Sequence, residues 1–251
     1  MKYTKAPVSE VILGITFVDP VFDINFLFKI QQMVEADFPK VEITPPLTDE
    51  WLDEFHLVAD FNPESTGAIL IRLRSIDLKW LIQIQSNKIY FNWVRGDEEE
   101  VGNYVGYEAI KEKFEHILNQ INIEPFLSKI KYFDITYHDR IILKDYISSI
   151  NEVGSLINTS LPKINTVQGF NSLFSKYTYQ LPEFDGYGIL SVNTDVAISG
   201  SQVLRLENAV RGTPKCLKIK NDFFAWFDSA HKYQNNYFED LFTTELLKQW
   251  E

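Results

Sequence analysis

Tyrosine, acidic, arginine and histidine side chains in the second half of the chain are spaced so that they could take part in chemistry. Tyr137, Asp139 and Arg140 lie in one short stretch, and His231 lies in a later aromatic segment. An arginine can hold a carboxylate or phosphate through two parallel hydrogen bonds, and a histidine exchanges protons near neutral pH. Tyr137, Arg140 and His231 are therefore the candidate ligand-binding residues.

A structural interpretation of the same residues competes with this one. On a strand, Tyr137 and Asp139 would point to one face and Arg140 to the other. An arginine on a strand commonly forms an ion pair with a helix carboxylate, for which Asp228 is available. A histidine within an aromatic helix, such as His231, commonly packs or caps. The sequence favours these structural roles and keeps ligand binding as the alternative.

No familiar catalytic or nucleotide-binding motif is present in the sequence. It contains no Gly-x-x-x-x-Gly-Lys-Ser/Thr phosphate loop, no Gly-x-Gly-x-x-Gly, no Gly-x-Ser-x-Gly elbow and no His-Glu-x-x-His. The four histidines lack metal-ligand spacing, and His116, beside Ile117, is expected on a helix surface. The single Cys216 cannot form an intrachain disulfide. We therefore expect no catalytic residue, no metal site and no cofactor.

Charge is distributed unevenly along the 251 residues. The formal net charge is −11, of which residues 1–125 carry −10 and residues 126–251 carry −1. An acidic surface repels nucleic acid and anionic membranes and attracts a basic protein. The densest acidic run, Asp97, Glu98, Glu99 and Glu100, is the candidate partner-binding surface, although such a run is also typical of a solvated loop.

Other classes of partner and location are also disfavoured. Lys215, Lys218 and Lys220 lie on one expected strand near Arg211, but no aromatic residues interleave with them as base stacking requires. Apolar runs fall far short of the roughly 20 residues needed to span a bilayer. The first residues carry no apolar signal-peptide segment. We expect a cytoplasmic protein that binds neither membrane nor nucleic acid.

The hydrophobic pattern predicts two similar halves, each with the order strand, helix, three or four strands, helix. In the first half, strands are expected at 8–18, 69–74, 80–85 and 88–93, with helices at 24–37 and 107–121. In the second, strands are expected at 131–143, 176–181, 187–194, 203–208 and 216–220, with a short helix at 143–150 and a helical region from Asp222 onward.

This order predicts an α+β fold in which an antiparallel sheet carries helices on one face, because alternating strands expect one solvated face. The halves, residues 1–125 and 126–251, are interpreted as a pseudo-duplication. They form either two units or one continuous domain, in which the two sheets join.

Three stretches together resemble a sporadically distributed family of uncharacterised bacterial proteins of similar length. They are Pro7-Val-Ser-Glu10-Val-Ile12, the strand 135–141 with Tyr137-His-Asp139-Arg140-Ile141, and the closing Trp226-Phe-Asp228-Ser-Ala-His231, Phe238-Glu239 and Thr244-Glu-Leu246. Thr136 and Asp139 depart from the family's usual Arg and Asn, so no polar site is carried over there. The resemblance implies this fold, a bacterial cytosolic setting and the patchy distribution of mobile or defence-associated genes.

These observations lead to two functional hypotheses. The first is a non-catalytic interaction or regulatory protein of a bacterial operon, such as an antitoxin, immunity or defence-associated subunit, that binds a basic protein partner. The alternative is an enzyme or small-ligand binder with a pocket involving Arg140 and His231. The sequence leaves the oligomeric state open.

Overall fold

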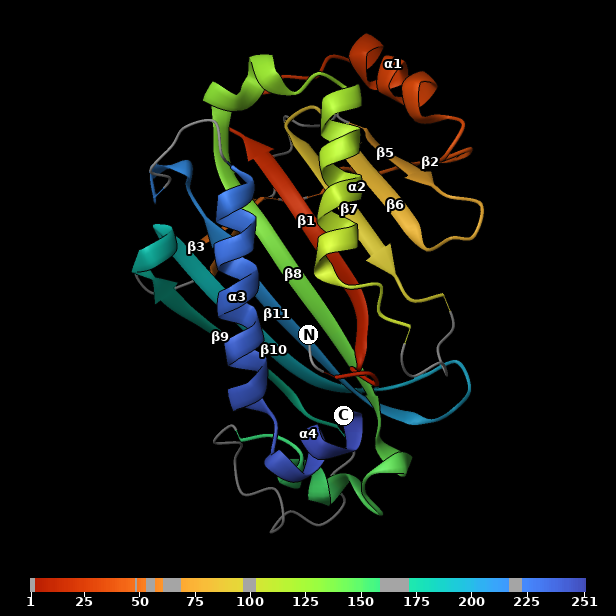
Figure 1. Cartoon of the computed structure of the whole chain (residues 1–251), viewed down its shortest axis with the longest axis vertical. Coiled ribbons are helices and arrows are strands. Elements are labelled where there is room, and N and C mark those ends of the chain that lie inside the picture. The colour runs from red at the N-terminus through yellow and green to blue at the C-terminus, as the bar shows by residue number, and fades with distance from the viewer. Residues whose placement is uncertain are drawn as a thin grey trace.

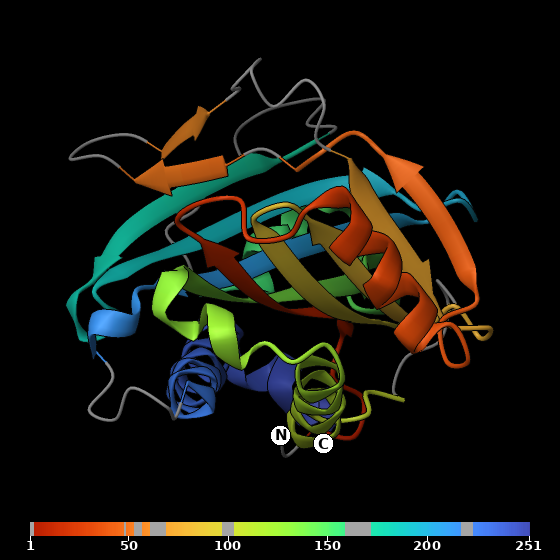
Figure 2. The same cartoon turned by 90° about the horizontal axis from the view of Figure 1, so that it is seen from above.

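The protein is an α+β structure built on one large antiparallel sheet (Figure 1). The computed structural model describes residues 3–47, 49–52, 57–60, 69–96, 103–158, 172–216 and 223–251. Two long helices, α2 (Tyr107–Gln120) and α3 (Phe224–Leu241), lie side by side on one face of the sheet (Figure 2). The predicted fold class is confirmed at this level.

The remaining elements complete the layers around these helices. The strands are β1 (Val8–Phe17), β2 (Lys40–Thr44), β3 (Asp49–Leu52), β4 (Leu57–Asp60), β5 (Leu70–Arg74), β6 (Trp80–Gln85), β7 (Lys88–Val94), β8 (Ile130–Ile142), β9 (Phe174–Leu181), β10 (Gly186–Val196) and β11 (Gln202–Gly212). The other helices are α1 (Ile24–Val34) and α4 (Thr244–Trp250). The short 3-10 helix η2 (Glu124–Lys129) joins α2 to β8.

Nine strands form the main sheet in the order β2-β5-β6-β7-β1-β8-β11-β10-β9, and β3 pairs only with β4. Strands β1 and β8 are antiparallel neighbours at the centre, so strands from before and after residue 125 share one sheet. The β3–β4 hairpin lies on the opposite side of the sheet from α2 and α3 (Figure 2).

Aromatic side chains fix the two long helices to the sheet. The ring of Phe114 on α2 stacks on Phe91 of β7 at 5.9 Å and meets Phe227 of α3 edge-on at 6.0 Å. Phe227 in turn meets Phe133 of β8 at 5.5 Å. All four side chains are fully buried. Because a buried aromatic ring removes a large apolar area from water, this cluster determines where both helices lie.

A second apolar cluster holds the C-terminal segment. Phe238 and Phe242 pack on Trp250 of α4 with ring centroids 5.8 and 4.9 Å away. The buried indole Nε1 of Trp250 donates a hydrogen bond to the hydroxyl of Tyr146 at 3.0 Å. This cluster covers the β10 and β11 end of the sheet.

Polar side chains line the face of the sheet away from the helices. Gln83 and Asn92 are buried and continue a row of hydrogen bonds across four strands. Arg72 Nε donates to Gln83 Oε1 at 3.0 Å, Gln83 Nε2 donates to Asn92 Oδ1 at 3.2 Å, and Asn92 Nδ2 donates to Glu10 Oε1 at 2.6 Å. The buried amides of Gln83 and Asn92 therefore both have the partners that burial demands.

A buried ion pair lies on the same face, across β8 and β11. Arg211 Nε donates to Asp134 Oδ2 at 2.7 Å, and its Nη1 donates to the Tyr187 hydroxyl at 2.8 Å. The guanidinium lies 5.0 Å from the ring centre of Tyr132 and 5.6 Å from that of Tyr187. Thr136 donates a further hydrogen bond to Asp134.

Several predicted elements differ from the structure in their ends or their kind. The strand expected at 216–220 is wrong at Cys216, because Pro214–Cys216 forms a 3-10 turn. Strand β11 before this turn extends to Gly212. Residues 217–220 lie outside the described residues. The helix expected at 143–150 is instead two 3-10 turns, Leu143–Asp145 and Ile150–Ser155. Strand β2, between Pro39 and Pro45, was not predicted.

Candidate functional site

Tyr137 and His231, two of the predicted site residues, are in direct contact between β8 and α3. The Tyr137 hydroxyl oxygen lies 2.8 Å from His231 Nδ1, and the amide nitrogen of Asn235, one helical turn later, lies 2.9 Å from Nε2. The imidazole also stacks on the ring of Tyr107 of α2, with ring centroids 4.0 Å apart and planes inclined by 11°. His231 is therefore bonded at both ring nitrogens and covered on one face.

These contacts keep the imidazole neutral at physiological pH. Burial lowers the pKa of His231 to about 4, because the charged ring would lose its hydration. With the Asn235 amide donating to Nε2, Nδ1 carries the proton and donates to Tyr137, whose hydroxyl then donates toward Tyr104 at 3.4 Å. Burial also raises the pKa of Tyr137 well above its usual value. The arrangement locks side chains together and leaves no ring nitrogen open for a ligand.

The pKa of His231 predicts a pH dependence of stability. The folded protein binds a proton at His231 less tightly than the unfolded chain does. The contribution of the neutral imidazole to the free energy of unfolding is therefore complete above pH 6.5 and is lost as pH falls toward 4. We expect His231→Gln to flatten the fall in unfolding free energy across that window, measured by urea denaturation at pH 4 to 7. The matched variant His116→Gln, at an exposed histidine, should keep the wild-type slope; equal slopes in all three proteins would contradict the assignment.

Asp228 connects the two long helices rather than binding the strand arginine. It accepts hydrogen bonds from the Tyr107 hydroxyl at 2.8 Å and from Lys111 Nζ at 2.7 Å. Lys111 also lies 3.1 Å from Glu108. Burial opposes the charge of Lys111, but the hydrogen bonds that its ammonium donates to Asp228 and Glu108 outweigh this effect and raise its pKa. This clamp holds α2 against α3.

Arg140 does not join Tyr137 and His231. Tyr137 faces the helices, so the alternation of β8 turns Arg140 to the opposite face, where it lies directly across from Arg205 of β11. A single pocket cannot contain both Arg140 and His231, since the sheet separates them. The acidic residues Asp97 to Glu100 lie outside the described residues.

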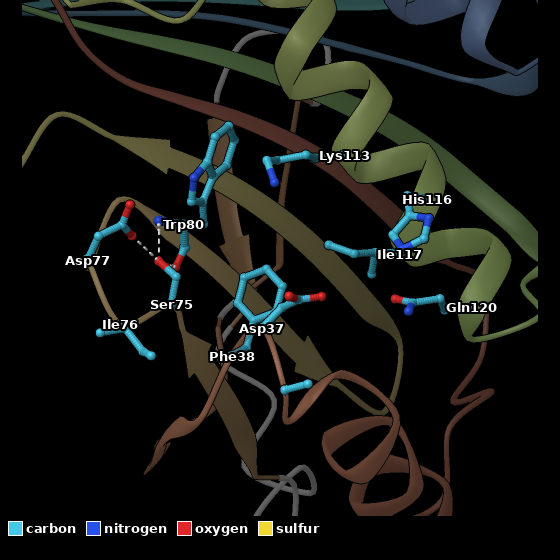
Figure 3. Close-up of a pocket in the computed structure, with 11 residues that line it drawn as sticks. Asp37, Phe38, Ser75, Ile76, Asp77, Trp80, Lys113, His116, Ile117 and Gln120 are labelled. Carbon is cyan, nitrogen blue, oxygen red and sulfur yellow. Dashed lines mark hydrogen bonds between the residues drawn. The ribbon is translucent and has the colours of Figure 1, made fainter.

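The structure contains an open cavity that the sequence did not indicate (Figure 3). It has a volume of about 580 Å³ and lies between α2, the β5–β6 turn and the segment after α1. Its lining residues are Ala36, Asp37, Phe38, Ser75, Ile76, Asp77, Trp80, Lys113, His116, Ile117 and Gln120. Trp80, Phe38 and Ile117 supply apolar walls, and the polar ends of Lys113, His116 and Gln120 reach the same space.

Trp80 is the aromatic wall of this cavity. One face of the indole stacks on Phe91 at 5.6 Å with planes inclined by 16°, which fixes its orientation. The ammonium of Lys113 lies 5.0 Å from the centre of the indole ring. A cation at that distance is attracted by the electron-rich face of the ring. Lys113 is thereby held at the mouth of the cavity.

The β5–β6 turn that forms the cavity's edge is ordered by its own hydrogen bonds. Ser75 Oγ donates to Asp77 Oδ1 at 2.6 Å, and the backbone N–H groups of Lys79 and Trp80 donate to Asp77 Oδ1 and Ser75 Oγ at 3.1 and 3.0 Å. The hydrogen bond from Ser75 lowers the pKa of Asp77. Asp77 is therefore committed to the turn, and its charge is already satisfied there.

Part of this cavity could have been found from the sequence. Lys113, His116 and Gln120 recur at helical spacing and share one face of the helix expected at 107–121. Asp37 and Trp80 come from other segments, and only the packing of α1 and β6 against α2 brings them to the same place. The expectation that His116 lies on the helix surface is confirmed.

A second cavity, of about 790 Å³, is lined by other residues of the C-terminal half of α2. It is lined by α2 and η2 residues and by the start of α3, namely Glu115, Asn119, Asn122, Ile123, Glu124, Leu127, Ser128, Pro214, Lys215, Phe223 and Phe224. Within the described ranges no group of three or more His, Cys, Asp or Glu side chains is arranged to hold a metal ion. No helix in those ranges is both long and apolar enough to cross a bilayer.

Comparison with known proteins gives a weak structural likeness and no match in sequence. No family model matches the chain, and no curated protein matches it; the family resemblance seen in the sequence therefore stays a prediction. Among solved structures, the di-domain ARO/CYC StfQ from the steffimycin biosynthetic pathway matches 96% of this chain and 97% of its own, with 10% identity and a TM-score of 0.28. A score this low defines no shared fold, and we derive no ligand from it.

These findings correct the first functional hypothesis. No family model and no curated protein supports an antitoxin, immunity or defence role for this chain. The hypothesis depended on net charge, on missing motifs and on the distribution of the resembled family, and none of these describes a binding surface. The interpretation of the chain as an operon interaction protein is therefore wrong, and the ligand-binding alternative is the one we develop.

Proposed function

We propose that this protein binds a small molecule in the cavity beside Trp80. The supporting observation is that an oriented indole, an ammonium group, an imidazole and an amide meet in about 580 Å³ of open space (Figure 3). Ligand pockets typically measure about 300–1,000 Å³ and combine apolar walls with a few convergent polar groups. The proposal keeps the ligand-binding alternative but moves the site from Arg140 and His231 to α2 and β6.

The position of the cavity on the scaffold supports this role. Its wall of α2 is fixed on one side by the aromatic cluster around Phe114 and on the other by the Asp228 clamp. Its Trp80 wall is held in place by stacking on Phe91 of the adjacent strand. A site whose walls are already rigid loses little conformational entropy when a ligand binds.

A blocking variant tests the proposal without removing any packed side chain. Ala36 is exposed and lines the cavity, so Ala36→Trp should fill it. We expect metabolites that raise the melting temperature of the wild-type protein in a screen to lose at least about tenfold in affinity in Ala36→Trp, a loss equivalent to about 1.4 kcal/mol. Glu35→Trp places the same bulk one residue away, outside the lining, and serves as the control.

Two results would refute the proposal. One is a wild-type protein that no compound of a broad metabolite panel stabilises. The other is a set of hits that bind Ala36→Trp as well as they bind Glu35→Trp.

We also propose that the chain is a duplicated unit with a boundary near residue 125. The pairing order supports this: β1 pairs with β7 and then come β6 and β5, while β8 pairs with β11 and then come β10 and β9. In the first half, β7 pairs with the opening strand β1 and is followed by the long helix α2. In the second half, β11 pairs with the opening strand β8 and is followed by the long helix α3. An experimental structure in which the halves do not superpose strand for strand would contradict the proposal.

A further inference from the structure

The cavity beside Trp80 presents a ligand with one positively and one negatively charged side chain. Among the described residues, neither Lys113 nor Asp37 has an ion-pair partner, and the Lys113 ammonium interacts there with the Trp80 ring alone. Asp77 also lines the cavity, but its carboxylate accepts the hydrogen bonds of the β5–β6 turn. The charges left for a ligand are therefore those of Lys113 and Asp37.

These two charges lie on different walls of the cavity. Lys113 extends from α2, whereas Asp37 lies on the segment after α1, and both side chains point into the space between them (Figure 3). A ligand with a single negative charge would meet Lys113 favourably but would bring its charge toward Asp37. A ligand with a single positive charge would have the reverse conflict with Lys113. Only a ligand that carries both charges is complementary to both walls.

The apolar part of the lining lies between the charged groups. Ile117 and Phe38 are buried in the floor, and Trp80 is half-buried with its indole at the cavity wall. Gln120 and His116 add hydrogen-bonding groups on the α2 side. This arrangement suits a ligand with an apolar side chain attached close to both of its charges.

We propose, resting on the proposed function of this cavity, that its ligand is a zwitterion of the amino-acid class with an apolar or aromatic side chain. Its carboxylate binds the Lys113 ammonium, its ammonium group binds the Asp37 carboxylate, and its side chain packs against Trp80 and Ile117. Binding neutralises two charges that no described residue pairs in the free protein.

Three matched probes test the charge requirement by calorimetry on the full chain. L-phenylalanine carries both charges, 3-phenylpropanoate lacks the ammonium group, and 2-phenylethylamine lacks the carboxylate. We expect L-phenylalanine to bind at least about tenfold more tightly than either of the others. Lys113→Gln should weaken L-phenylalanine and 3-phenylpropanoate but not 2-phenylethylamine, and Asp37→Asn should weaken L-phenylalanine and 2-phenylethylamine but not 3-phenylpropanoate. Glu112→Gln, an exposed residue of α2 outside the lining, is the control.

The outcomes separate this inference from the proposed function. If 3-phenylpropanoate or 2-phenylethylamine binds as tightly as L-phenylalanine, and Ala36→Trp abolishes that binding, the zwitterion inference is wrong and the cavity is still a binding site. Absence of binding by all three probes also overturns the inference, while the metabolite screen decides the proposed function independently. Probe binding that Ala36→Trp does not weaken overturns the zwitterion inference, because the probes then bind outside the cavity.

Discussion

Replacing Arg211 by methionine is expected to lower the free energy of unfolding by about 3–5 kcal/mol. The Asp134 and Arg211 side chains are only 5% and 14% exposed, so the substitution leaves a carboxylate buried without its counter-charge. It also removes the hydrogen bond from Arg211 to Tyr187. For a chain of this length, a loss of that size lowers the melting temperature by roughly 10 °C, which calorimetry or circular dichroism would detect.

A matched pair in the same region provides the control for Arg211. Lys215 and Asp185 lie 3.7 Å apart with side chains 83% and 49% exposed, and Lys215→Met should cost less than about 1 kcal/mol. The double variant Asp134→Leu with Arg211→Met should recover most of the loss, because it removes both buried charges. Equal costs for Arg211→Met and Lys215→Met would show that burial of the pair contributes nothing.

Asp139→Asn is expected to stabilise the protein at pH 8 and to leave its stability unchanged at pH 4. Burial raises the pKa of Asp139 to about 7, although the nearby Arg95 charge opposes the shift. A raised carboxyl pKa means that the folded state is most favoured while the group is protonated, and that stability is lost as pH rises from about 4 through 7. At about 1.4 kcal/mol for each factor of ten in proton affinity, the variant gains at most about 4 kcal/mol at pH 8.

The measurement compares urea unfolding of wild type and Asp139→Asn at pH 4, 6 and 8. His231 has the opposite dependence between pH 4 and 6.5, so the difference between the two proteins is informative where the wild-type curve alone is not. Asp145→Asn, at an exposed position, should show no pH-dependent difference. A destabilised Asp139→Asn at pH 8 would mean that the charge of Asp139 is needed by Arg95.

The regular elements were predictable because their signals are local. The alternation around Trp80–Gln85, the two-residue turn at Ser86-Asn87 and the apolar stripe of Ile110, Phe114 and Ile117 each determine their element within a few residues. Strand β2 is short, and although Val41 and Ile43 alternate with polar residues in it, the prolines on either side favoured a loop there. Its pairing with β5 stabilises it through contacts distant in sequence.

The candidate site was predictable only in part, for the same reason. The contact between Tyr137 and His231 joins two residues that the sequence singled out, and the alternation of β8 correctly separates Arg140 from Tyr137. The cavity depends on how α1 and α2 pack relative to the β5–β6 turn, and no local sequence pattern determines that packing. Net charge indicated a partner surface at Asp97 to Glu100, which the described residues do not include.

The central position of β1 has a consequence for how the chain is made. β1 pairs with β7 on one side and with β8 on the other, and β8 leaves the ribosome only after more than a hundred further residues. Until then the nascent protein presents an unsatisfied backbone edge beside the apolar Val11, Leu13 and Ile15. Such an edge adds strands from any neighbouring chain. The first half is therefore expected to need protection by a chaperone during translation, and slow synthesis between β7 and β8 should lower the yield of native protein.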